Sequence, residues 1–366
     1  MKKRITALLK KSPGLKARQI AHELGVDRKE VSSFFVKNLD AFVQDPQTYT
    51  WPLVQSASFV LEISSSGLWV TQFHFEKALK KSGSPLDTDH GHVVIKVVNE
   101  QKVLLCAAAR IIALCNQLVR SNKKVVLDLS GNEQTLSYLD RAAFFDRLDA
   151  SVDVKPGRPK KSAAQQYMAN NSGLVELLEI RNDINVPERI KESFAEKFGD
   201  EHANKLFTVV GETVCNVEDH SNTVIPGFAG LQYYGRAVKK TIVVVISDSG
   251  DGICNTLRPG LKKYFPDVAK RFEPSTHAAD PKLIIYAMVN GGLSSLGGDR
   301  GAGLNATHLN AEKLDAAISI RQENFSVRLV YKAGALEQPS WELNLPRLKG
   351  TQIVFEFKLD KSSNSG

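Results

Sequence analysis

Two polar residues four positions apart are the first candidates for chemistry in this sequence. Glu212 and Asn216 lie in a stretch whose pattern predicts helix from about Pro187 onward, so both side chains share one face, a turn apart. An amide oxygen can ligate Mg²⁺, a cation that prefers oxygen, and a carboxylate can orient and deprotonate a water molecule. A solvated helix face would carry the same residues, so the pair by itself leaves both interpretations open.

An acidic residue directly after an apolar segment is the second candidate. The β-preferring run from Thr241 to Ile246 predicts a fully buried strand, and it leads into Asp248, Gly250 and Gly252. A carboxylate at a strand end can accept a hydrogen bond from an exocyclic amine such as adenine N6. The glycines let the backbone turn sharply and approach the ring closely. A polar loop after a core strand is the alternative interpretation.

A glycine-rich segment further along has groups that suit phosphate. Residues 297–304 stand before an expected helix over residues 305–314. Glycines ahead of a helix leave backbone N–H groups free to hold phosphate, assisted by the helix dipole. The candidate phosphate contacts are Arg300, Gly301, Gly303 and Leu304. A flexible loop would have the same composition.

The last motif is Gly350 followed by Thr351, at the start of an alternating segment. Apolar residues at every second position predict a half-buried strand over residues 352–359. Thr351 can contact phosphate or position Asp248, and a simple strand start is the alternative.

In this order the four motifs resemble those of the Bergerat-fold, or GHKL, ATPases, which include gyrase B, MutL, histidine kinases and anti-sigma kinases. The matching residues are Glu212 and Asn216 for the N-box, Asp248, Gly250 and Gly252 for the first glycine box, Gly301 and Gly303 for the second, and Gly350 and Thr351 for the last strand. The resemblance implies an α/β sandwich over residues 163–360, with ATP beneath a mobile lid between Gly252 and Gly303. It also implies Mg²⁺ on Asn216, adenine on Asp248, and Glu212 as the catalytic base.

Three functions remain open for such a domain. The first is a DNA-associated, Mg²⁺-dependent ATPase or ATP-gated regulator that forms a homodimer when ATP is bound. The second is a protein serine kinase of the anti-sigma type, and the third is a module that binds ATP without hydrolysis. Glu212 favours hydrolysis, because a binding-only site has no need of a base. The expected lid is long and carries helices of its own, over residues 257–265 and 281–289.

Residues 1–53 predict a basic helical unit. Residues 1–40 contain ten Lys and Arg against four acidic residues, a formal charge of +6, which suggests an anionic partner. Helices are expected over residues 5–11, 17–24 and 28–37, with Gly25 in a turn and Asp27 as an N-cap. The pattern resembles winged-helix modules that bind double-stranded DNA, with a wing over residues 45–53. The expected DNA contacts are Arg28, Lys29, Ser32 and Lys37. Such modules also dock proteins, and a solvated basic face is the third alternative.

Residues 55–154 predict a small α/β domain. Strands are expected over residues 92–98 and 124–129, helices over 103–120 and 135–148, and a hairpin from 58–64 and 67–75. Residues 125–131 (VVLDLSG) resemble the strand-to-loop motif of STAS domains, which occur in partner-switching sigma-factor regulators. That resemblance implies a protein partner, and a generic strand–helix unit explains the segment about as well.

A basic linker is expected over residues 155–162. Within it, Gly157, Arg158 and Pro159 resemble the core of an AT-hook, an arm that inserts Arg into the minor groove. A plain basic linker is the favoured interpretation.

The length of 366 residues and the 42% hydrophobic content fit two or three domains with real cores. We find no apolar run of membrane-spanning length and no signal peptide, and therefore expect a cytoplasmic protein without a membrane partner. The four cysteines form no Cys-x-x-Cys pair and are expected as free, buried thiols. Residues 361–366 are expected to be a disordered tail.

Overall fold

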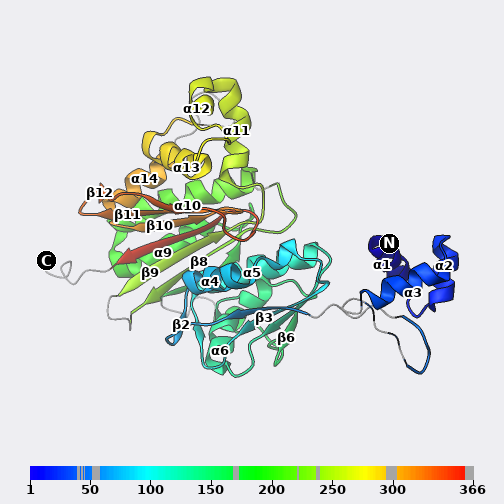
Figure 1. The fold of residues 1–366 in the computed structure, drawn as a ribbon. Coiled ribbons are helices and arrows are strands. Elements are labelled where there is room, and N and C mark those ends of the chain that lie inside the picture. The colour runs from blue at the N-terminus through cyan, green and yellow to red at the C-terminus, as the bar shows by residue number, and fades with distance from the viewer. Residues whose placement is uncertain are drawn as a thin grey trace.

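The computed structural model describes residues 1–38, 42, 44, 46–51, 58–167, 173–220, 222–235, 240–293 and 303–358, without the side chains of Lys10, Tyr167 and His220. Over these ranges the chain is mixed α/β with several sheets (Figure 1). Arg300, Gly301, the tail and residues 45, 52 and 53 of the expected wing lie outside the described residues, and the wing residues that are described, 46–51, form a turn and coil without a strand. None of the helices in the described ranges combines the length and apolar content needed to cross a bilayer.

The N-terminal unit consists of three short helices, which confirms the predicted elements. They are α1 (Lys2–Lys11), α2 (Ala17–Leu24) and α3 (Arg28–Val36). Gly25 ends α2 in the left-handed conformation, and the Asp27 carboxylate caps α3 by accepting from the Lys29 N–H at 2.6 Å. Trp51 stacks on the buried ring of Phe35, with ring centroids 4.2 Å apart. Trp51 therefore packs on the helical core of this unit.

The middle unit is built on a parallel sheet. Its strand order is β1 (Phe59–Ile63), β3 (His92–Val97), β5 (Lys124–Asp128) and β6 (Asp153–Lys155), with a small parallel pair of β2 (Trp69–Val70) and β4 (Lys102–Val103) beside it. The helices are α4 (Gln72–Ser82), α5 (Leu105–Arg120), α6 (Glu133–Arg141) and α7 (Phe144–Arg147), with a short 3-10 turn η1 (Pro85–Asp87). The predicted strands and the long helix are confirmed at nearly the expected bounds.

Two predictions in the middle unit are wrong. Residues 58–75 form no hairpin, because β1 pairs in parallel with β3 and the chain turns into α4 at the N-cap Thr71. The apolar alternation over residues 67–75 therefore spans a strand end and a helix start. The expected helix over residues 135–148 is divided between α6 and α7 at Ala143, whose φ of 57° lies in the left-handed region.

The expected linker is bound to the body of the protein at Arg158. The Arg158 guanidinium donates to the carbonyl oxygens of Phe145, Leu148 and Val152 at 3.1 to 3.3 Å. These carbonyls lie at and after the C-terminal end of α7, where backbone acceptors lack helical partners. The side chain is therefore occupied within the molecule, which contradicts an extended arm.

The C-terminal unit contains an antiparallel sheet of eight strands. Its order is β12 (Ala335–Leu336), β11 (Ser326–Lys332), β10 (Ala317–Arg321), β14 (Gln352–Lys358), β9 (Thr241–Ser247), β8 (Phe228–Tyr234) and β7 (Leu174–Glu179), and β13 (Ser340–Glu342) also pairs with β11. The helices are α8 (Ala163–Tyr167), α9 (Val186–Phe198), α10 (Asp200–His220), α11 (Ile253–Tyr264), α12 (Pro266–Arg271), α13 (Ala279–Asn290) and α14 (Gly303–Lys313). The fully buried strand predicted before Asp248 is confirmed as β9.

The helical predictions for this unit need two corrections. The helix expected from about Pro187 to the Glu212 motif is interrupted at Gly199, whose φ of 80° ends α9 before α10 begins. The expected lid helices are confirmed as α11 and α13, but α12 lies between them, started by Pro266 in its first turn. Figure 1 shows α11 and α12 at the top of the view, with α13 between them and α14.

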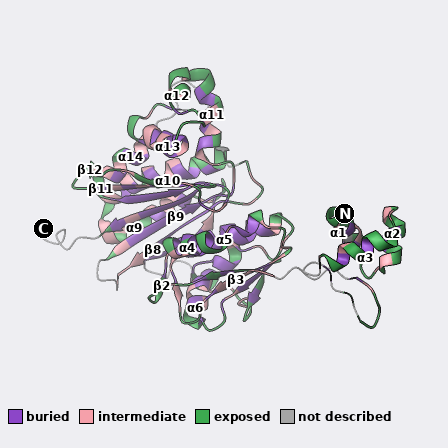
Figure 2. Cartoon of the chain, viewed as in Figure 1, coloured by how far each residue is buried: buried purple, intermediate pink, exposed green. Residues whose placement is uncertain are grey.

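Strand β14 is buried on both faces, so the prediction of a half-buried strand is wrong. Phe355 and Phe357 pack with the helices on one face, whereas Val354 belongs to the core that includes the middle unit. The polar residues of the second face have hydrogen-bond partners within the core. Ser247 Oγ donates to Gln352 Oε1 at 2.5 Å, and Gln72 of α4 donates to Glu356 at 3.1 Å. The middle unit and the C-terminal sheet therefore share one continuous core (Figure 2).

Candidate functional site

A cavity of about 250 Å³ lies between the C-terminal sheet and the helices that cover it. Residues from α10, α11, α13 and α14 form its walls, and residues from β9, β10 and β14 form its floor. Of the residues singled out from the sequence, it is lined by Glu212, Asn216, Asp248, Gly252, Gly303, Leu304 and Thr351. The fold thus brings together residues that are up to 139 positions apart in the chain.

The floor of the cavity is apolar. It is formed by Ile246, Ile318, Ile320, Ile353 and Phe355, all of which belong to central strands of the sheet. Met288, Leu293 and Leu257 extend this apolar surface onto the helical side. An apolar floor with a few polar groups at defined positions is typical of sites for small organic ligands, because the floor binds a flat ring and the polar groups orient it.

Asp248 is the buried acid of the site. It directly follows β9 and is 6% exposed. Its Oδ1 accepts the Gly250 N–H at 2.7 Å, which gives Gly250 a supporting role outside the cavity lining. Burial raises the pKa of the Asp248 carboxyl, and hydrogen bonds from Gly250 and Thr351 oppose that rise. The carboxylate is thus a constrained acceptor on an otherwise apolar wall.

Thr351 holds Asp248 in place from the neighbouring strand. The Asp248 N–H donates to the Thr351 carbonyl at 2.9 Å, and the Thr351 N–H donates to the Asp248 carbonyl at 3.2 Å. A hydrogen bond from the Thr351 side chain also lowers the pKa of Asp248. These contacts agree with the prediction that Thr351 positions Asp248.

Gln322, which no sequence motif marks, connects Thr351 to the start of α11. This residue is 3% exposed and follows β10. Its Nε2 donates to Thr351 Oγ1 at 3.1 Å, and its Oε1 accepts the Ile253 N–H, the first of α11, at 2.8 Å. The start of α11 is therefore connected to Thr351 at the edge of the cavity. Gly252 must remain small here, because a Cβ atom would lie 2.7 Å from Gln322 Oε1.

Glu212 and Asn216 face the cavity from α10. Glu212 is half-buried and Asn216 is exposed. The Glu212 carboxylate lies against Gly303 at the start of α14, close enough that a Cβ atom at position 303 would be 2.4 Å from Oε2. A potential base therefore stands beside the free N–H groups of a helix N-terminus. Cys215 between them is exposed, contrary to the prediction that all four thiols are buried.

The described rim of the cavity carries few groups that could hold a phosphate or a magnesium ion. Gly303, Leu304 and Thr307 of the first turns of α14 line it, whereas the described lining residues include no Lys or Arg. The described ranges also contain no group of three or more His, Cys, Asp or Glu that could hold a metal ion. Asn216 can supply one oxygen ligand, and Mg²⁺ at such a site takes its other ligands from phosphate and water.

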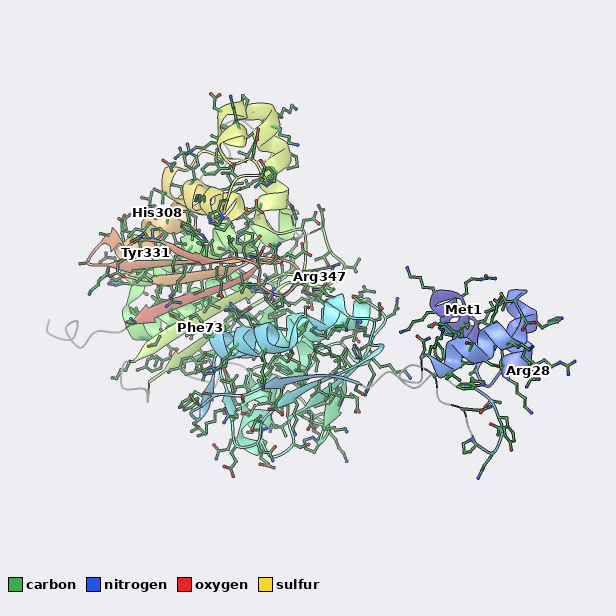
Figure 3. The ribbon with its side chains drawn as sticks, viewed as in Figure 1. Met1, Arg28, Phe73, His308, Tyr331 and Arg347 are labelled. Atoms are coloured by element: carbon green, nitrogen blue, oxygen red, sulfur yellow. The ribbon has the colours of Figure 1, made fainter. Side chains whose placement is uncertain are left out.

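The expected DNA contacts lie in the N-terminal unit and are separate from the cavity lining. Arg28 and Lys29 are exposed on α3, and Lys37 is exposed directly after it; Figure 3 labels Arg28 on this unit. Ser32 is only half-buried on the flank of the helix, whereas Ser33 is exposed. Ser32 is thus a less exposed candidate for a DNA contact than its neighbour Ser33.

Comparison with protein-family models, with curated proteins and with solved structures yields no match to this chain.

Proposed function

We propose that the cavity binds ATP with Mg²⁺ and that the protein is a DNA-associated ATPase or ATP-gated regulator of the Bergerat, or GHKL, type. One observation carries this proposal: Glu212, Asn216, Asp248, Gly303 and Thr351 come from separate elements and line a single cavity with an apolar floor. The order of these motifs along the chain supports the family resemblance, and the geometry supports the same division of roles.

Asp248 and the floor are assigned to adenine. The isoleucines of β9, β10 and β14 offer a flat apolar surface to the ring, and the Asp248 carboxylate accepts a hydrogen bond from the exocyclic amine. The buried Asp248 carboxylate has lost its hydrating water, so a hydrogen bond from the exocyclic amine of adenine strengthens binding. A ring without that amine would leave the carboxylate unpaired and would bind more weakly.

Glu212 is assigned as the general base. Its carboxylate lies beside Gly303, at the helix N-terminus that we assign to the phosphates. It would orient a water molecule and take its proton as the bond to the terminal phosphate breaks. Asn216, one turn along α10, would ligate Mg²⁺, which neutralises phosphate charge when it is bound. Arg300 and Gly301, outside the described residues, complete the predicted phosphate contacts.

The N-terminal unit is assigned to double-stranded DNA. The exposed cations Arg28 and Lys29 on α3, and Lys37 directly after it, are suited to phosphate contacts. The +6 charge of residues 1–40 supports a nucleic-acid partner. ATP-dependent homodimerisation is part of this proposal, because a nucleotide-closed lid changes the surface of the chain.

The decisive experiment titrates a fluorescent ATP analogue with Mg²⁺ into the full chain and measures phosphate release with and without duplex DNA. We expect Asp248→Asn to bind ATP about 10- to 100-fold more weakly, and Glu212→Gln to bind normally without releasing phosphate. Asp267→Asn, an exposed acid on α12, is the control. Equal ATP affinity in wild type and Asp248→Asn would remove the adenine assignment.

The same preparation separates the alternative functions. Release of free labelled phosphate identifies an ATPase, whereas label on a partner protein identifies a serine kinase. Binding without either product identifies an interaction module.

A further inference from the structure

Gln117 of α5, in the middle unit, contacts both loops that lead into the cavity. Gln117 is 3% exposed, and its Nε2 donates to Ser249 Oγ at 2.9 Å and to the Lys349 carbonyl at 3.0 Å. Its Oε1 accepts the Lys349 N–H at 2.9 Å. Both amide N–H groups and the carbonyl oxygen are therefore used.

The two residues to which Gln117 is hydrogen-bonded are close in sequence to residues that line the cavity. Ser249 directly follows Asp248, and Lys349 is separated from Thr351 only by Gly350. The two loops are in close contact, since a Cβ atom on Gly350 would lie 2.6 Å from the Ser249 Cα atom. A side chain that bridges Ser249 and Lys349 therefore fixes the relative position of Asp248 and Thr351 from behind the cavity.

Other hydrogen bonds from the middle unit hold the chain segment that leads to Thr351. Ser84 Oγ donates to the Arg347 carbonyl at 2.6 Å, and Arg347 Nη2 donates to the Leu86 carbonyl at 2.8 Å. Arg347 lies where the two units meet (Figure 3). The segment before Gly350 is thus attached to the middle unit at both of its ends, and Gln117 is the attachment nearest to the site.

We propose that Gln117 is a positioning residue for nucleotide recognition, through which the middle unit sets the direction of the Asp248 carboxylate. This inference rests on the proposed ATP-binding function. Gln117 does not line the cavity, so its effect on the nucleotide passes through Ser249 and Lys349. A change in the position of α5, such as a partner bound to the middle unit could cause, would reach the adenine-binding acid by this route.

Its neighbour Asn116 offers a matched control. Asn116 is also buried on α5 and also holds a loop by two hydrogen bonds: Nδ2 donates to the Arg147 carbonyl and Oδ1 accepts the Asp149 N–H, both at 2.9 Å. That loop follows α7 and contributes nothing to the described lining of the cavity. Gln117→Leu and Asn116→Leu therefore remove comparable interactions from adjacent positions.

The test compares ATP with purine riboside triphosphate, which lacks the exocyclic amine. For Gln117→Leu we expect ATP affinity to fall about tenfold while the affinity for the analogue is unchanged, because only the amine depends on the direction of Asp248. Asn116→Leu should bind both nucleotides like wild type. In the nucleotide-free chain, amide exchange over residues 248–252 should be faster in Gln117→Leu than in Asn116→Leu.

The outcomes separate this inference from the proposed function. If wild type binds ATP and Gln117→Leu either binds it equally well or loses both nucleotides equally, Gln117 does not position Asp248. If wild type fails to bind ATP, the proposed function itself is wrong and the inference is lost with it. A selective loss for ATP, accompanied by faster exchange over residues 248–252, supports both.

Discussion

Gly303 and the Glu212 carboxylate are in such close contact that a single added methyl group would have to displace the carboxylate. The Cβ atom of Gly303→Ala would lie 2.4 Å from Glu212 Oε2 and 3.4 Å from the carboxyl carbon. The carboxylate is the far end of a flexible side chain, so we expect it to rotate away at a stability cost below about 1 kcal/mol. We predict that Gly303→Ala binds ATP but hydrolyses it about 100-fold more slowly, like the loss of a general base.

Gly211→Ala is the matched control for this prediction. It adds the same methyl group one residue before Glu212, where nothing lies within 4 Å of the new atom. Phosphate release should be unchanged in Gly211→Ala. Equal rates in the two alanine variants would show that the contact with Gly303 does not matter for hydrolysis.

Gly350→Ala should instead unfold the site. Its Cβ atom would lie 2.2 Å from the Asp248 carbonyl oxygen and 2.6 Å from the Ser249 Cα atom, and both obstacles are main-chain atoms. The backbone at Gly350 also has a φ of 81°, which side chains disfavour. We expect urea denaturation to show a loss of roughly 3 kcal/mol or more. Gly334→Ala has a similar φ of 70° and open space around it, so it should lose only about 1 kcal/mol. Similar losses in both variants would contradict the steric argument.

Asp248→Asn should stabilise the nucleotide-free protein while it abolishes adenine recognition. Burial raises the pKa of the Asp248 carboxyl, so the folded state holds this proton more tightly than the unfolded state. The resulting stabilisation is fully present below the unfolded pKa and is lost as the pH rises through the folded pKa. At neutral pH the buried carboxylate therefore destabilises the fold, and the amide removes that penalty.

Thermal denaturation across pH and nucleotide titration measure these two effects. The melting temperature of Asp248→Asn should exceed that of wild type at pH 7, and the difference should shrink as the pH falls through the raised pKa. ATP affinity should fall about 10- to 100-fold, because the adenine amine then meets an amide. Asp251→Asn removes an exposed acid from the same loop and should change neither quantity greatly. A lower melting temperature for Asp248→Asn at pH 7 would contradict the burial argument.

Glu76 is the shared partner of two buried arginines. Its carboxylate accepts from Arg110 Nη1 at 2.6 Å and from Arg321 Nε at 3.3 Å, and Arg321 is fully buried. Arg321 belongs to β10, whereas Glu76 and Arg110 belong to the middle unit, so this ion cluster crosses the shared core. Glu76→Gln leaves two buried cations without a counter-charge, and we expect a loss of about 3–5 kcal/mol in urea denaturation.

A surface pair provides the comparison. Glu342 forms an ion pair with Lys80, and about half of each side chain is exposed. Glu342→Gln should cost less than about 1 kcal/mol, because exposed ion pairs are hydrated and screened. If Glu76→Gln were equally mild, the buried cluster would contribute little to the attachment of the two units.

Features that depend on local periodicity could be predicted from the sequence. Features that depend on which distant segment of the chain packs against an element could not. The shared face of Glu212 and Asn216, the buried strand before Asp248 and the helix after Gly303 follow from spacing within a few residues. The burial of Gln352 does not, because its partners Ser247 and Asp248 lie more than 100 positions away. The alternation of apolar and polar residues over β14 predicted one exposed face. In the structure the middle unit covers that face.

The residues that support the site were missed for the same reason. Gln322 and Gln117 occupy no motif, and their importance arises from contacts with Thr351 and Lys349 across 29 and 232 positions. A glutamine at the end of a strand or in a helix is ordinarily a surface residue. Only the packed arrangement shows that these two are buried and hydrogen-bonded through both their amide nitrogen and oxygen.

The final prediction concerns the N-terminal unit. Lys29 is exposed in the first turn of α3, where a cation can contact a DNA phosphate. Lys29→Ala should weaken binding about equally for different duplex sequences and reduce the slope of log affinity against log salt by about 1, because one fewer counterion is released.

Fluorescence anisotropy with labelled duplexes over a range of salt concentrations measures that slope. Lys332→Ala removes an exposed lysine from β11 and should leave it unchanged, which separates a local contact from the general effect of net charge. An equal fall in both variants would indicate a diffuse attraction to the basic chain. An unchanged slope in the double variant of Arg28 and Lys29 would exclude α3 as the DNA-binding surface.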